Sequence, residues 1–118
     1  MAIQIVGTRN SLVTSYIGIG TWLGLATGNP GTTTTPANEA TGGSPAYARK
    51  QTTWGSASAS ASTGTAVTID VNTGTYTFCI LASAVTLATT NQVDNAAITS
   101  TVLAAQGQVI LTPSVTIA

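Results

Sequence analysis

The sequence lacks histidine altogether and contains a single cysteine, Cys79. Histidine is the commonest general base and a frequent metal ligand, so its absence excludes Ser-His and Cys-His catalytic arrangements. One cysteine excludes an internal disulfide, and its position in the apolar segment TFCIL predicts a buried, unreactive thiol. The three carboxylates, Glu39, Asp70 and Asp94, fall in separate segments. We therefore predict no catalytic residue, no metal site, no cofactor and no enzymatic activity.

Charge is also scarce. Only 5% of the residues are charged, and three Lys or Arg balance three Asp or Glu, which gives a net charge of zero. Nucleic acid binding needs a basic patch, so this composition excludes it. A chain so poor in charge either self-associates within an assembly or presents a soluble surface of Thr and Ser. Composition leaves both interpretations open.

Membrane and export signals are missing as well. No apolar run reaches the roughly 18 residues of a membrane-spanning helix. The segment after Met1, AIQIVGTRN, has no basic region ahead of an apolar one. We therefore expect no membrane partner and no signal peptide.

What the sequence does contain is apolar residues, 43% of the total, interrupted throughout by Thr, Ser and Gly. A length of 118 residues predicts one domain over residues 1–118. Apolar residues at positions 12, 13, 16 and 17 fit a short helix over residues 8–17, although a strand fits the same residues. Residues 21–25 are typical of a buried strand.

A long polar loop is predicted over residues 28–46, which include four consecutive threonines, Thr32 to Thr35. Loops of more than about 15 residues are usually functional or ordered by a partner, and this one has no obvious apolar anchor. It leads into residues 47–54, whose mixed pattern predicts an edge strand with charges that discourage stray pairing. Glu39 and Arg49 are a plausible ion pair that pins the loop to this strand, worth only about 0–1 kcal/mol if exposed.

The clearest structural signal is strict alternation over residues 66–71, with Val67, Ile69 and Val71 directed inward. Asn72-Thr73-Gly74 is typical of a tight turn, and an apolar return strand follows over residues 75–82. We expect these two strands to form a hairpin.

The remaining segments predict further strands. Residues 81–87 could continue the return strand, and residues 89–97 are typical of a polar loop. The segments 98–103 and 108–112 should form a second pair, and residues 114–118 should lie along an edge. Seven or so short strands joined by turns predict an antiparallel β-sandwich, of jelly-roll or immunoglobulin-like type.

Several segments resemble one group of proteins. They are Asn29-Pro30-Gly31, Ala37-Asn38-Glu39, TGGSPAYARK from Thr41 to Lys50, Thr53-Trp54-Gly55, VTIDVNTGTYT from Val67 to Thr77, and Ala104 to Val109. These segments resemble small virion proteins of tailed phages, common among phages of actinobacteria and labelled head decoration, minor tail or tail fibre proteins. The resemblance covers roughly residues 8–113. It implies a β-sandwich component of the virion, made in the cytoplasm of the bacterial host, with no enzymatic role.

Within that group we expect a capsid decoration (cement) protein, bound to the shell in many copies and stabilising it. A chain of this length without a shaft is short for a fibre, and a nearly uncharged surface can be buried without a large desolvation cost. The expected partners are the major capsid protein or other virion proteins, and identical copies should associate as a trimer or dimer. We expect the contact in the long loop, at Asn29, Pro30, Thr33, Thr34, Asn38 and Glu39.

The alternative is a minor tail or tail fibre protein that contributes to binding a receptor or glycan on the host surface. That role predicts a cluster of exposed aromatic side chains.

Overall fold

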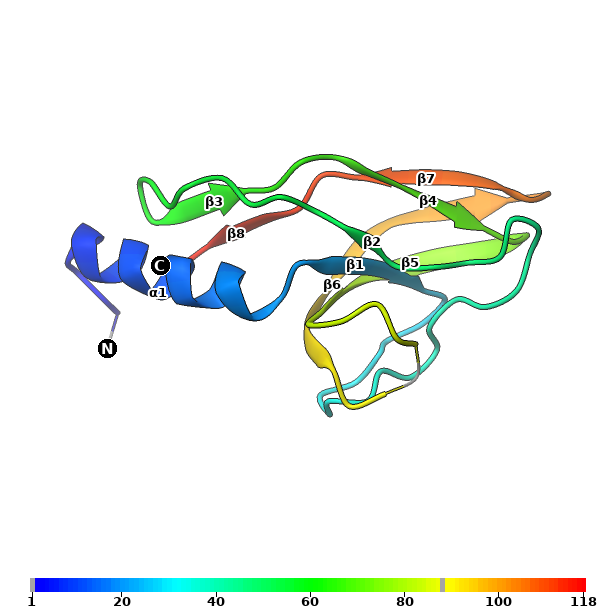
Figure 1. Ribbon diagram of the computed structural model, residues 1–118, viewed down its shortest axis with the longest axis horizontal. Coiled ribbons are helices and arrows are strands. Elements are labelled where there is room, and N and C mark those ends of the chain that lie inside the picture. Colours follow the sequence, from blue (N-terminus) through cyan, green and yellow to red (C-terminus); the bar gives the residue numbers. More distant parts are fainter. Residues whose placement is uncertain (1, 88) are drawn as a thin grey trace.

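The computed structural model describes residues 2–87 and 89–118. In that part of the chain one helix, α1 (Val6–Ile19), precedes the strands β1 (Trp22–Ala26), β2 (Lys50–Gln51), β3 (Ala61–Thr63), β4 (Val67–Val71), β5 (Gly74–Ala82), β6 (Gln92–Leu103), β7 (Gly107–Leu111) and β8 (Ser114–Thr116). Every strand pairing among these is antiparallel. The protein is therefore mainly β with a short N-terminal helix, as predicted (Figure 1).

Two sheets enclose one core. The larger has the strand order β2-β1-β5-β6, and it faces the pair β4-β7. The buried cluster takes Leu23 and Leu25 from β1, Ile69 from β4 and Val109 from β7. Because side chains from both sheets meet in this cluster, the architecture is the predicted antiparallel sandwich.

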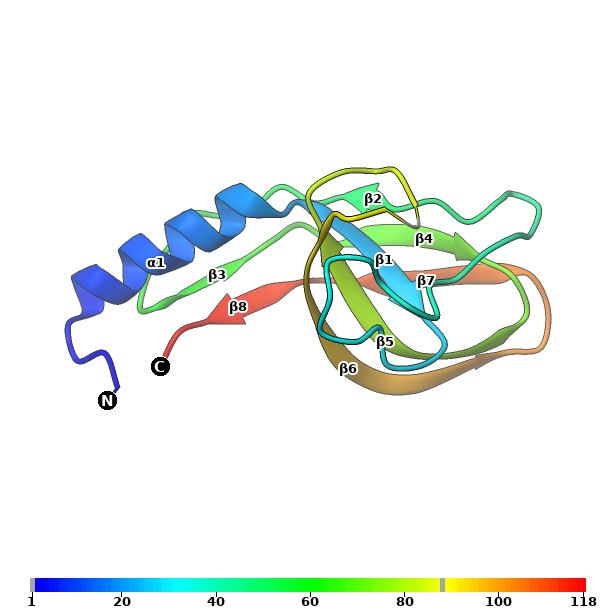
Figure 2. The same ribbon diagram turned by 90° about the horizontal axis from the view of Figure 1, so that it is seen from below.

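The third pair, β3-β8, leaves the sandwich and runs beside α1 (Figures 1 and 2). The side-chain Oδ1 of Asn10 accepts from the backbone N–H of Ser60, 2.8 Å away, and joins the helix to this pair. The molecule is therefore elongated, with extents of 47 × 25 × 22 Å. The N-terminus and the C-terminus lie at this same end, as both figures show.

The N-terminal segment is a helix, so the strand that fitted the same residues is not formed. It is longer than predicted and ends at Ile19, before Gly20, whose backbone is extended. The buried strand predicted over residues 21–25 is confirmed as β1, which lies inside the larger sheet between β2 and β5.

The predicted hairpin of residues 66–71 with 75–82 is wrong. Both segments are strands, but β4 pairs with β7, whereas β5 pairs with β1 and β6. The turn at Asn72 and Thr73 carries the chain from one sheet to the other, and the Tyr76 hydroxyl, which donates to the Asn72 carbonyl at 2.7 Å, holds this crossing. Alternation correctly placed Val67, Ile69 and Val71 in the core, but it carries no information on which strand lies alongside.

The second predicted pair is wrong for the same reason, because residues 98–103 and 108–112 lie in β6 and β7, in different sheets. The polar loop predicted over residues 89–97 is also wrong beyond residue 91, where β6 begins. β6 is an edge strand with one face in solvent, and this position tolerates its polar residues. The return strand stops at Ala82 and does not continue to residue 87.

The strand predicted over residues 47–54 is reduced to β2, which is an edge strand as expected. The strand was predicted to carry exposed charges that discourage stray pairing. Lys50 is exposed, as that prediction requires, but Arg49 is buried. The weak segment over residues 55–64 contributes β3, and the C-terminal segment forms β8 along the β3 edge.

Candidate functional site

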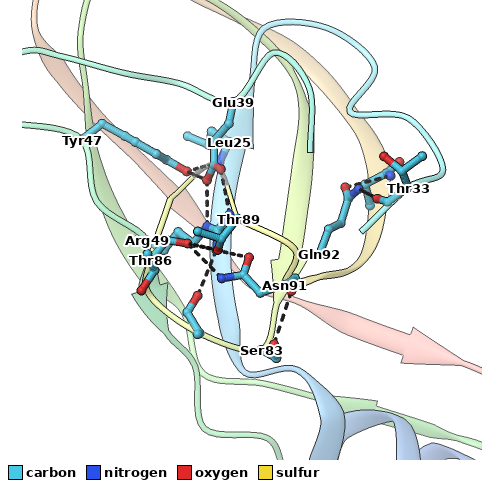
Figure 3. A network of polar contacts seen from close by, with 12 residues as sticks. Leu25, Thr33, Glu39, Tyr47, Arg49, Ser83, Thr86, Thr89, Asn91 and Gln92 are labelled. Carbon is cyan, nitrogen blue, oxygen red and sulfur yellow. Dashed lines mark hydrogen bonds and ion pairs between the residues drawn. The ribbon is translucent and has the colours of Figure 1, made fainter. Parts of the chain in front are cut away.

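The most highly connected side chain is that of Arg49, which is 1% exposed. Its Nε and Nη2 donate to Oε2 and Oε1 of Glu39, each over 2.8 Å. Its Nη1 donates to the carbonyls of Ala84 and Thr86 and to Oδ1 of Asn91, over 2.9, 2.8 and 2.7 Å (Figure 3). One guanidinium therefore links the long loop that carries Glu39 to the connection between β5 and β6.

Tyr47 completes this network. Its hydroxyl donates to Oε2 of Glu39 over 2.8 Å and accepts from the backbone N–H of Leu25 over 3.0 Å (Figure 3). Burial, and then the neighbouring Glu39 carboxylate, raise the pKa of the Tyr47 phenol well above its usual value. The phenol therefore stays neutral and remains a donor.

Gly24 makes room for this network on the face of β1. A Cβ atom at this position would collide with the Tyr47 hydroxyl and lie 2.9 Å from Oε2 of Glu39. A glycine inside a strand often marks such a close approach. The network is also complete, because no buried side-chain nitrogen or oxygen in residues 2–87 and 89–118 lacks a hydrogen-bond partner. Glu39 and Arg49 therefore hold the long loop and the connection between β5 and β6 together.

A polar cleft lies between β6 and the run of threonines in the long loop, Thr32 to Thr35, which we call the threonine segment. It measures about 450 Å³ and is lined by Asn29, Gly31, Thr32, Thr33, Thr34, Gln92, Val93, Asp94 and Asn95. The Gln92 side-chain amide donates to the carbonyl of Thr33 over 2.6 Å, and that of Asn95 donates to Gly31 over 2.8 Å. Its walls therefore carry neutral hydrogen-bonding groups and one carboxylate.

A second, more apolar cleft of about 450 Å³ lies where α1 meets the sheets, and its lining includes Tyr16, Trp54, Ile98, Leu111 and Val115. The Tyr16 hydroxyl donates to Oδ2 of Asp94 over 2.7 Å at this cleft. Burial, and then the hydrogen bond to Asp94, raise the pKa of Tyr16.

Cys79 lines the apolar cleft and is only partly buried, so the predicted burial of this residue is not complete. Burial raises the pKa of this thiol. The thiol form is therefore favoured over the reactive thiolate, in line with the predicted low reactivity.

The structure places the six predicted contact residues in two groups. Asn29, Thr33, Thr34 and Asn38 are exposed on the loop, whereas Pro30 is buried and Glu39 is used internally. The predicted ion pair between Glu39 and Arg49 is present and pins the loop, and hydrogen bonds from Gln92 and Asn95 fasten it further. The predicted lack of an apolar anchor is wrong, because Pro30, Pro36 and Ala40 of the loop are buried. The chain itself orders this loop, so its length gives no evidence for a partner.

Sequence reasoning missed Gln92, Asn95 and Tyr47 as the residues that fasten the loop. The signal that could have found part of this network is Gly24, flanked by Leu23 and Leu25 in a strand. Gln92 and Asn95 gave no signal, since both fall in a stretch typical of a polar loop.

Within residues 2–87 and 89–118, no group of three or more His, Cys, Asp or Glu side chains is arranged to hold a metal ion. No helix in that part of the chain has the length and apolar character needed to cross a membrane. None of the six aromatic side chains, all of which are described, is exposed.

The fold and these contacts define a class: a small antiparallel β-sandwich whose buried polar groups hold its loops in place. A family model described as "Podophage GP4 fiber I protein gp80" matches residues 13–115. This range covers most of the chain, so the chain belongs to that family and is a phage structural protein, a component of the virion. No curated protein matches the chain, and no solved structure matches it.

Proposed function

We propose that the chain is a non-enzymatic structural component of a phage tail fibre. The observation that carries this proposal is the match to a fibre protein family over residues 13–115. The elongated shape supports it, because α1 and the β3-β8 pair extend the sandwich along one axis to 47 Å (Figure 1). The full engagement of Arg49 and Glu39 in loop packing also fits a mechanical role.

The fibre role replaces capsid decoration as the preferred function, because the family carries a fibre name. One argument for decoration, that a long unanchored loop needs a shell partner to order it, no longer applies. The four exposed loop residues, Asn29, Thr33, Thr34 and Asn38, remain a prediction for contacts with other virion proteins. The association of identical copies as a trimer or dimer is also part of the proposal.

Contribution to host-surface binding belongs to the same proposal, and the polar cleft is the place for it. Thr32, Thr33 and Thr34 supply hydroxyls, and Asn29 and Gln92 supply amides around it. Neutral groups of this kind suit the hydroxyls of a surface glycan. The cluster of exposed aromatic side chains predicted for this role is absent from the described residues, so the glycan would be held by polar contacts without ring stacking.

Copy number and position in the particle test the fibre role. Quantitative gel analysis of purified virions should give a few copies to tens of copies, and antibody labelling in electron micrographs should mark the tail. Hundreds of copies with label over the head would contradict the fibre role and restore decoration. For the cleft, Thr33→Trp should reduce binding of the purified protein to host cells, whereas Thr53→Trp, at an exposed site outside the cleft, should not.

A further inference from the structure

The polar cleft carries a negative charge. Asp94 is the one charged side chain among the described residues that line it. The rest of this lining consists of Thr, Asn, Gln, Gly and Val, so no basic side chain there compensates the carboxylate. A single charge in neutral walls determines which ligands the cleft attracts and which it repels.

The three basic side chains of the chain lie elsewhere. Arg49 pairs with Glu39 in the interior, and Arg9 of α1 bonds two backbone carbonyls that precede the helix. Lys50 is in β2, at the opposite edge of the four-stranded sheet from β6. Three strand spacings of about 4.8 Å separate these edges, which is more than the screening length of about 8 Å in physiological salt. The field in the cleft is therefore that of Asp94.

The Asp94 carboxylate is held in one orientation. Its Oδ2 accepts from the Tyr16 hydroxyl over 2.7 Å, and its Oδ1 accepts from the backbone N–H of Asn95 over 2.8 Å. Its backbone belongs to β6, where it pairs with Leu81 of β5. A carboxylate has about four acceptor positions, so these two bonds leave about two. Because Asp94 is exposed, the remaining positions are open to a ligand.

The opposite wall of the cleft is fixed relative to this carboxylate. The amides of Gln92 and Asn95 hold the threonine segment and Gly31 against β6 over 2.6 and 2.8 Å (Figure 3 shows the contact of Gln92 with Thr33). The threonine side chains of this wall are exposed, and a hydroxyl can donate or accept. A bound molecule would therefore meet an acceptor on one side and hydroxyls on the other.

Hydroxyl groups of a neutral sugar fit this arrangement better than charged groups do. An acidic sugar would bring a like charge beside the uncompensated Asp94 carboxylate, and this contact is unfavourable. An amino sugar would gain only an exposed ion pair, which contributes little. A sugar hydroxyl donates to the carboxylate in a charge-assisted hydrogen bond, which is stronger than a bond between neutral groups.

We propose that the polar cleft selects neutral glycans, and that Asp94 sets this selectivity by accepting hydrogen bonds from sugar hydroxyls. This inference rests on the glycan binding in the proposed function and narrows the class of ligand. The fibre role itself does not depend on it.

Binding of the purified full chain to host cells tests the selectivity. Asp94→Asn preserves the shape of the side chain and an oxygen that can accept from Tyr16, but it removes the charge. Its affinity should fall about tenfold, because a charge-assisted hydrogen bond is lost. Asp70→Asn changes the net charge equally at a site outside the clefts and should bind like the wild type. Wild-type affinity should be the same at about 0.05 and 0.5 M salt, since a neutral ligand has no charge to screen.

The opposite results are equally specific. A rise in affinity of Asp94→Asn would show an acidic ligand, and weaker wild-type binding at high salt would show a basic one. An unchanged affinity, or an equal fall in Asp70→Asn, would show that Asp94 does not contact the ligand. Each of these results overturns the selectivity but leaves binding at the cleft, provided that Thr33→Trp still reduces it. If Thr33→Trp binds like the wild type, the proposed glycan site itself is wrong.

Discussion

Arg49 and Glu39 form a two-point ion pair in the protein interior, with both N–O distances at 2.8 Å and side-chain exposures of 0% and 7%. Removing one partner of a buried pair leaves an uncompensated charge and typically costs about 3–5 kcal/mol. We therefore expect Glu39→Gln to lower the free energy of unfolding by about that amount, measured by urea denaturation.

The control for this variant is Asp70→Asn, at a carboxylate that accepts from Gln108 at the surface over 2.9 Å. An asparagine oxygen can still accept this bond, so the loss should stay below about 1 kcal/mol. An equal loss of unfolding free energy in both variants would contradict the larger contribution expected of the buried Glu39–Arg49 pair.

Gly24→Ala tests whether the network needs the open space on β1. The added methyl would collide with the Tyr47 hydroxyl, and overpacking of this kind costs about 1–3 kcal/mol. The loss should be smaller when the same substitution is made in a Tyr47→Phe background, since the obstructing hydroxyl is gone. Additive losses in the double-mutant cycle would refute the proposed collision.

Alkaline pH should destabilise the protein through Tyr47. Its pKa is raised in the folded state, and a tyrosine in the unfolded chain has a pKa of about 10. Above that pH the unfolded chain releases a proton that the folded chain retains, so the free energy of unfolding falls as pH rises. Tyr47→Phe should make the decline between about pH 9 and 11 shallower, measured by urea denaturation at each pH. An unchanged slope would contradict the role of this phenol.

Gln92→Ala should release the threonine segment without unfolding the sandwich. The side chain donates to the Thr33 carbonyl over 2.6 Å, and one such bond contributes about 0.5–1.5 kcal/mol. Hydrogen exchange should become faster at the Ala37 amide, which bonds the Pro30 carbonyl within the loop. Gln51→Ala removes an exposed amide that bonds Thr21, and it should leave this exchange rate unchanged. Faster exchange in both variants would show a general loosening.

The local sequence pattern predicted which residues form strands better than it predicted which strands pair with each other. Val67, Ile69 and Val71 were correctly assigned to the core because their alternation is a property of the segment itself. The pairing of β4 with β7 was missed, since it joins residues about forty positions apart and depends on which sheet has a vacant edge. Turn chemistry at Asn72-Thr73-Gly74 fits a hairpin and a crossing between sheets equally well.

The Glu39–Arg49 ion pair was likewise predictable from local sequence only in part. Opposite charges at positions 39 and 49 on a loop and its following strand made the contact predictable. Its burial was not, because burial depends on Gly24 and on the carbonyls of Ala84 and Thr86, which come from two distant segments.

The buried ion pair influences the shape of a site that it does not touch. Arg49 joins the loop of residues 28–46 to the connection that leads into β6, and this loop and the start of β6 form the walls of the polar cleft. A change at the buried pair would therefore alter the cleft without replacing any residue that lines it.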